Sequence, residues 1–148
     1  MAKKKTKIIR KEDSKLMKFL FKFIKVFNPK FMDEYTTVIG ETIYTPKLWE
    51  KMSKKKQIVI LNHEDIHIQQ YKRCKPWFIV SYLLLPFPLF LSYFRCKYEA
   101  EAFVINIRCG LSVDAVVDEL CGPKYLFAGT FFGKKRVKGW IEQELHKS

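Results

Sequence analysis

The chain has 148 residues, 48% of them hydrophobic, which fits one domain with its own core and argues against an intrinsically disordered protein. The formal net charge of +13 is typical of proteins that meet a nucleic acid, an anionic membrane surface or an acidic partner. Four widely spaced cysteines, with no Cys-x-x-Cys pair, argue against a zinc ribbon, and we expect reduced thiols in a cytoplasmic protein.

The first part of the chain is strongly basic. Residues 1–12 predict a solvated arm, and the absence of a small-residue cleavage site after the next apolar stretch argues against a secretory signal. Residues 14–27 have helical periodicity and end at Asn28-Pro29. The apolar stripe contains Leu16, Phe19, Leu20, Phe23, Ile24 and Phe27, and lysines occupy another face. Such a helix either binds an anionic membrane surface or another polyanion, or packs on the core. We therefore separate residues 1–27, the arm and helix, from a domain over residues 28–148.

The next segment carries the clearest strand signal. Residues 35–45 contain two β-branched and aromatic runs around Gly40-Glu41, which predicts a tight β-hairpin. Residues 46–56 predict a short helix, and residues 57–75 predict a longer helix that Pro76 stops.

An uncharged apolar run follows and is interrupted by prolines. Residues 77–94 are barely long enough to cross a bilayer, and Pro86 and Pro88 break the run near its middle. Further helices are predicted over residues 95–109, 113–120 and 138–147, and Ser112 is the expected N-cap of the second of these. The predicted fold class is α+β, mostly helical.

The histidines carry the chemical signal of the sequence. The chain has three of them, and His63 and His67 stand four residues apart with Glu64 beside the first. On a helix, this spacing lets both imidazoles reach one zinc ion at about 2.0–2.1 Å, while the glutamate activates a zinc-bound water as catalytic base. His-Glu-x-x-His is a known metallopeptidase motif, so the assignment follows an established pattern. The competing interpretation is a pair of ordinary solvated histidines.

The motif and its surroundings resemble the gluzincin branch of the zincin metallopeptidases, and small phage and bacterial proteins with the same motif. The resemblance covers residues 35–105 and includes a downstream Glu-x-Glu-Ala segment. It implies a minimal zincin core in which Glu99 is the third zinc ligand, with Glu101 as the alternative. Gln70 and Arg73 stand where a metzincin would have glycine and histidine, which excludes that class. No asparagine precedes Glu99 and no aspartate follows it by four, unlike better-known gluzincins.

Other parts of the site are less determined. Gln70 is expected either to support the ligands or to be an exposed helix residue. The residue that stabilises the oxyanion is one of Tyr71, Tyr93, Tyr98 and His146. Residues 42–45 are expected to act as an edge strand that pairs with an extended substrate, or only to cover the core.

The third ligand also constrains the apolar run. A straight helix over residues 77–94 would separate its ends by roughly 27 Å, so His67 and Glu99 could not share an ion. The zinc interpretation therefore predicts an apolar helical hairpin that reverses at residues 86–88, and excludes a single membrane span.

Taken together, the sequence predicts a zinc-dependent peptidase that acts on a peptide or protein. The alternative is a non-catalytic basic structural protein, associated with a virion or membrane, that retains a zincin-like core. An integral membrane protein is the third class.

Overall fold

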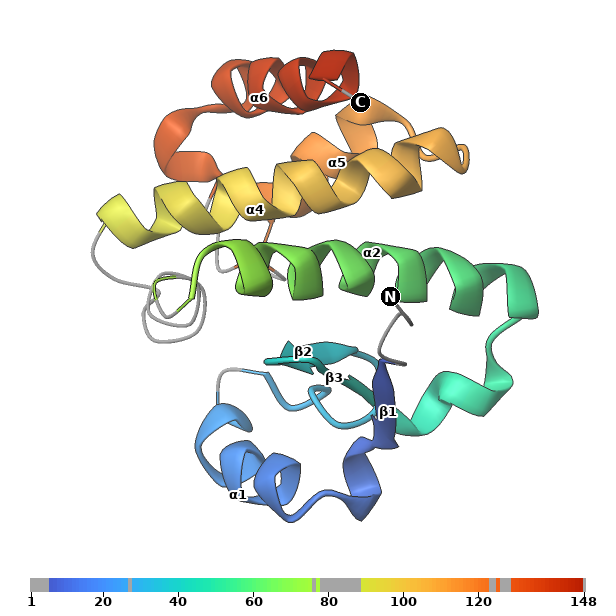
Figure 1. Cartoon of the computed structure of the whole chain (residues 1–148). Coiled ribbons are helices and arrows are strands. Elements are labelled where there is room, and N and C mark those ends of the chain that lie inside the picture. Colours follow the sequence, from blue (N-terminus) through green and yellow to red (C-terminus); the bar gives the residue numbers. More distant parts are fainter. Residues whose placement is uncertain are drawn as a thin grey trace. The chain divides into compact units, whose positions relative to one another are not determined.

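The structure is a computed structural model that describes residues 6–26, 28–75, 77, 89–122, 125 and 129–147, without the side chains of residues 89–92. It is mostly helical with one small sheet, so the predicted α+β class is confirmed (Figure 1). The chain divides into two compact units, residues 1–64 and 65–148, and the division falls inside helix α2 (Lys54–Arg73) rather than after residue 27.

None of the described helices combines the length and the apolar character that crossing a bilayer requires. Most of the apolar run at 77–94, including the reversal predicted at residues 86–88, lies outside the described residues.

The sheet of the first unit has three strands in the order β1-β3-β2. Their bounds are β1 (Lys7–Arg10), β2 (Thr37–Ile39) and β3 (Thr42–Thr45). Strands β2 and β3 are antiparallel, and Gly40 between them has φ 62°, a left-handed conformation that favours glycine. The predicted hairpin is therefore confirmed. Strand β1 pairs in parallel with β3, and no short-range signal in the sequence pointed to that pairing.

Two predictions about this region are wrong. Residues 7–12 are not part of a solvated arm, because Ile8 and Ile9 lie in β1, and Lys11 in the following 3-10 turn (Lys11–Asp13) is fully buried. Residues 42–45 are not an edge strand either. Strand β3 is bonded to β1 on one side and to β2 on the other, which leaves no free ladder for a substrate.

Lys11 is accommodated by Phe31. Its Nζ donates a hydrogen bond of 2.7 Å to the Phe31 carbonyl oxygen and lies 3.5 Å from the centroid of the Phe31 ring. Burial lowers the pKa of Lys11 from 10.5 to about 7, and attraction to Glu64 opposes part of this effect.

Helix α1 (Lys15–Ile24) begins at Ser14, whose Oγ accepts a hydrogen bond from the Met17 amide. One of its faces packs in the core of the first unit. This core cluster contains Met17, Phe31, Met32 and Tyr44, with Ile9, Leu20, Phe21, Ile24 and Ile39 packed against it. The predicted stripe is thus split, because Leu20 and Ile24 face the core whereas Leu16, Phe19 and Phe23 are exposed.

A short 3-10 helix, Lys47–Lys51, precedes α2, which confirms both helices predicted between residues 46 and 75.

The second unit contains α4 (Leu89–Arg108), α5 (Val113–Leu120) and α6 (Lys134–Lys147). Ser112 caps α5 by accepting from the Ala115 amide, as predicted. Helix α6 begins four residues earlier than predicted. All four cysteines are free thiols.

These three helices share one apolar core. Its buried members are Ala100, Phe103, Val116, Val117, Leu120, Cys121, Tyr125, Val137 and Ile141. The packing fixes which face of α4 is turned inward, and this determines the position of the acidic residues on that helix.

The lowered pKa of Lys11 predicts an unusual dependence of stability on pH. Between pH 7 and 10.5 the unfolded chain holds a proton on Lys11 that the folded chain lacks, so stability rises with pH in that window. The contribution of this one group approaches about 1.4 kcal/mol for each pH unit. Urea denaturation at pH 7, 8 and 9 should show this increase in the wild type and a flatter dependence in Lys11→Met. The exposed-site control Lys55→Met should follow the wild type, and an equal pH dependence in all three proteins would contradict the assignment.

Candidate metal site

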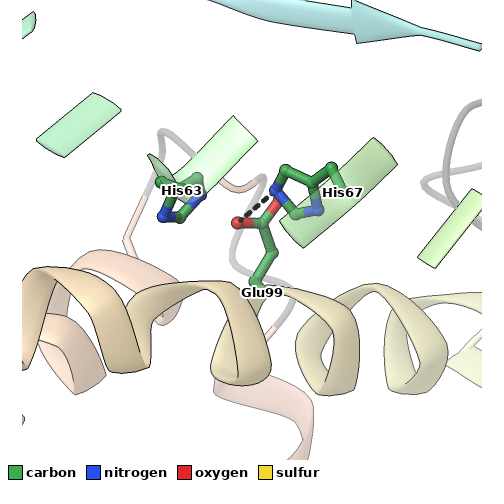
Figure 2. Close-up of side chains that lie close together, drawn as sticks. All are labelled: His63, His67 and Glu99. Carbon is green, nitrogen blue, oxygen red and sulfur yellow. Dashed lines mark ion pairs between the residues drawn. The ribbon is translucent and has the colours of Figure 1, made fainter. Parts of the chain in front are cut away.

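Three side chains that can bind a metal gather where α2 meets α4. His63 and His67 lie one turn apart on α2, and Glu99 extends toward them from α4 (Figure 2). Each offers a ligand atom, and these atoms all lie within 4.8 Å of one another. The three residues are only 8%, 2% and 1% exposed, respectively. They are the residues that the motif and the resemblance nominated.

The distance between the ligand atoms of His67 and Glu99 suits a tetrahedral ion. Two atoms that each lie about 2.1 Å from such an ion are about 3.4 Å apart. His67 Nε2 lies 3.6 Å from Glu99 Oε2, close to that value. Two nitrogens and one carboxylate oxygen also form the donor set of many catalytic zinc sites, which keep a fourth position open. The residues present therefore fit a zinc ion.

The rotation of α4 distinguishes Glu99 from Glu101. A helix turns by about 100° per residue, so two residues two positions apart point about 200° apart. Glu99 lies on the buried side of α4 with Ala102 and Phe103, whereas Glu101 is partly exposed. Glu101 instead accepts hydrogen bonds from Gln70 and Arg73. It is not a member of the group that could hold a metal.

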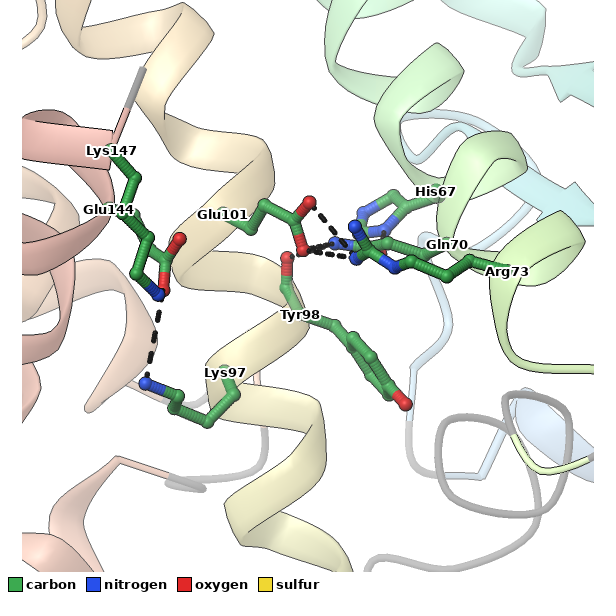
Figure 3. Close-up of polar contacts among 8 residues, drawn as sticks. All are labelled: His67, Gln70, Arg73, Lys97, Tyr98, Glu101, Glu144 and Lys147. Atoms are coloured by element: carbon green, nitrogen blue, oxygen red, sulfur yellow. Dashed lines mark hydrogen bonds and ion pairs between the residues drawn. The ribbon is translucent and has the colours of Figure 1, made fainter.

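Gln70 fixes the orientation of His67. Gln70 is fully buried, and its Oε1 lies 2.8 Å from Nδ1 of His67 (Figure 3). Its Nε2 donates to the carbonyl oxygen of Tyr98 at 2.9 Å and to Oε2 of Glu101 at 3.0 Å. Because both acceptors lie at the amide nitrogen, the amide oxygen must face His67, and Nδ1 of His67 must carry the proton. Nε2 of His67 is then the nitrogen left to bind an ion.

The network continues to the surface of the second unit. The Arg73 guanidinium donates to both carboxylate oxygens of Glu101, at 2.8 and 3.1 Å (Figure 3). This bidentate ion pair fixes the Glu101 carboxylate where it accepts the hydrogen bond from Gln70. The hydrogen bond to Glu101 also raises the pKa of Arg73, which stays charged. A chain of contacts thus runs from Arg73 to the imidazole of His67.

Cys96 lies near the site without joining the group. It is buried one turn before Glu99 on α4. Burial raises the pKa of its thiol to about 12, and Glu99 adds to the effect. A thiol with this pKa keeps its proton at neutral pH, and it is the thiolate that binds zinc.

Glu64 is buried on α2 and directly follows His63 in the sequence. It lies close enough to Lys11, within the first unit, for the attraction between them to raise the pKa of the lysine. Lys11 was missed by sequence reasoning because nothing in the sequence separates it from the other lysines of the N-terminal segment.

The four residues predicted as candidates to stabilise an oxyanion make other contacts or are exposed to solvent. Tyr93 packs edge-on against Trp140, with ring centroids 5.2 Å apart, and His146 is exposed on α6. The Tyr98 ring points away from His67 and Gln70 (Figure 3). Tyr71 is partly exposed, and the Lys75 ammonium lies over its ring.

The sequence matches no family model, and no curated protein or solved structure is significantly similar to it. The interpretation of the site therefore depends on the residues and geometry of this chain.

The contact between Gln70 and His67 predicts a loss of metal affinity on substitution. Gln70→Ala removes the group that orients His67 and should weaken zinc binding by about 10- to 100-fold. Gln69→Ala is the matched control, because Gln69 is exposed and its amide donates a hydrogen bond to Asp65, which is not a member of the metal-binding group. Competition titration with a chromogenic zinc chelator measures both affinities. Equal affinities in the two variants would mean that Gln70 does not position the ligand.

Proposed function

We propose that this chain is a zinc metallopeptidase in which His63, His67 and Glu99 hold the ion. The proposal is carried by one observation: two imidazoles from α2 and a carboxylate from α4 place their ligand atoms within 4.8 Å of one another in a buried position. Glu64 adds to it, because this buried carboxylate completes the motif on the same helix.

The donor set favours zinc but is shared with another class. Two histidines and one carboxylate with open positions also hold iron in non-haem oxygenases. A carboxylate next to the first histidine has a direct use in hydrolysis, since it can take a proton from an attacking water. Glu64 is thus the residue that favours a hydrolase.

The mechanism assigns separate tasks to the residues. A zinc ion held by the three ligands would lower the pKa of a coordinated water to about 7 and polarise the substrate carbonyl. Glu64 accepts the proton of the attacking water and passes it to the leaving amine. Gln70 keeps Nε2 of His67 directed at the ion position, and Glu101 with Arg73 keeps Gln70 in place. Burial of the site strengthens each of these charge interactions.

The substrate is proposed only as a class. A peptide bond in a host or phage protein is the first choice, and a cell-wall peptide is the second. Cytoplasmic, membrane-associated and virion-associated locations are compatible with this activity. The alternative function, a basic structural protein with a non-catalytic site, predicts the same fold without turnover.

The metal content tests the first half of the proposal. Purified protein should contain about one zinc per chain by elemental analysis, and His67→Ala should lose most of it. Glu99→Ala should weaken zinc binding more than Glu101→Ala, because Glu99 faces the histidines while Glu101 acts through Gln70. Iron instead of zinc, or the same zinc content in wild type and His67→Ala, would contradict the proposal.

The role of Glu64 tests the second half. Glu64→Gln should keep the zinc and lose hydrolysis by at least 100-fold, because a general base contributes about 10²–10⁴ to the rate. Cleavage of a mixed peptide library, followed by mass spectrometry, measures the activity of the wild type, of Glu64→Gln and of chelator-treated protein. Loss of zinc in Glu64→Gln would show that the residue is a ligand. Zinc-loaded wild type that cleaves no more than Glu64→Gln would favour the non-catalytic alternative.

A further inference from the structure

Helix α1 has a second apolar face that the core of its unit does not cover. Phe19 and Phe23 are 56% and 63% exposed, and their rings meet edge to face with centroids 5.3 Å apart. Leu16 precedes them and Val26 follows them, and both are also exposed. These four exposed residues lie on one side of α1 and of the turn that follows it, and we term them the phenylalanine strip.

The phenylalanine strip is distinct from the face that packs inward. At 100° per residue, its centre lies about 130° around the helix from the centre of the core-facing residues. The core-facing residues are Met17, Leu20, Phe21 and Ile24. Removing Phe19 or Phe23 would therefore leave the core contacts of α1 in place.

Lysines border the strip on the side away from the core. Lys15, Lys18, Lys22 and Lys25 are all exposed, and α1 contains no acidic residue. None of the four makes a recorded ion pair with any residue in the described part of the chain. Their charges are thus available to an external anion.

We propose that α1 docks this protein on an anionic lipid bilayer. The phenylalanine strip enters the interface between headgroups and acyl chains, and the adjacent lysines contact anionic headgroups. The aliphatic Leu16 and Val26 favour a lipid over a nucleic acid, because bases stack on aromatic rings rather than on aliphatic side chains. This inference does not depend on the proposed catalytic activity.

The structure determines which variants can test the proposal. Deleting residues 1–27 would remove β1 and the buried Lys11, so the first unit would lose part of its sheet and core. Point substitutions at exposed positions avoid this problem. Phe19→Gln with Phe23→Gln removes the rings and keeps a residue that favours helix. The matched control is Ile58→Gln with Phe131→Gln, which alters two apolar side chains of similar exposure elsewhere.

A second pair of variants tests the charges. Lys18, Lys22 and Lys25 are changed together to glutamine, and the control changes Lys51, Lys55 and Lys56, which are also exposed. Both triple variants remove the same net charge. Each lysine near an anionic surface accounts for about fivefold in binding at low salt.

Binding of the full-length protein is measured by co-sedimentation with two kinds of vesicle. One is phosphatidylcholine alone, and the other also contains about 30% phosphatidylserine, which gives the vesicle surface a negative potential. We expect the wild type to bind to the anionic vesicles only. The phenylalanine variant and the Lys18 triple variant should each bind at least tenfold more weakly than the wild type. Both control variants should lose less affinity. Circular dichroism should show unchanged helix content in every variant.

Four results would overturn the proposal. The first is no binding of the wild type to anionic vesicles. The second is wild-type binding by the phenylalanine variant, and the third is equal losses in the two lysine triple variants. The fourth is a dimer in the wild type that becomes a monomer in the phenylalanine variant by analytical ultracentrifugation, because a second copy would then cover the strip. Retained vesicle binding in the Ile58 and Phe131 control supports the assignment to α1.

Discussion

The burial of Glu99 is the constraint on which the candidate site depends. A carboxylate that is 1% exposed loses its hydration, which costs several kcal/mol unless nearby groups compensate. His67 Nε2 lies 3.6 Å away and His63 completes the group. A divalent cation shared by all three residues would compensate for the charge of the buried carboxylate. The apolar core that α4 shares with α5 and α6 holds the carboxylate in this position despite its cost.

Polar side chains connect this charge to the rest of the second unit. The amide of Gln70 contacts a ligand imidazole, a backbone carbonyl and a carboxylate at once, so His67 on α2 is oriented by groups on α4. Buried polar networks of this kind are stable only when each member has its partners. Lys11 in the first unit obeys the same rule, because its ammonium has a carbonyl and an aromatic ring in place of water. Lys11 differs in this respect from the lysines of α1, which are exposed to solvent.

Local sequence patterns determined much of the fold and part of the site. The spacing of His63 and His67 placed two imidazoles on one helix face, because that relation depends only on the helical repeat. Gly40 between β-branched runs determined a hairpin, and Ser112 determined a helix start, because turns and caps are decided by a few neighbouring residues. Pro76 correctly predicted where the long helix stops, because α2 ends at Arg73, shortly before the proline.

Only the tertiary structure decided the relations between distant segments. Glu99 and Glu101 have the same chemistry and neighbouring positions, and the packing of α4 turns one toward the histidines and the other toward Arg73. Strand β1 was hidden in a basic segment, because its partner β3 lies more than thirty residues away and its pairing leaves no local period. The helical periodicity of α1 predicted an amphipathic helix but could not separate the residues that face the core from Phe19 and Phe23. That choice depends on where Phe31 and Tyr44 lie in space, which only the folded chain defines.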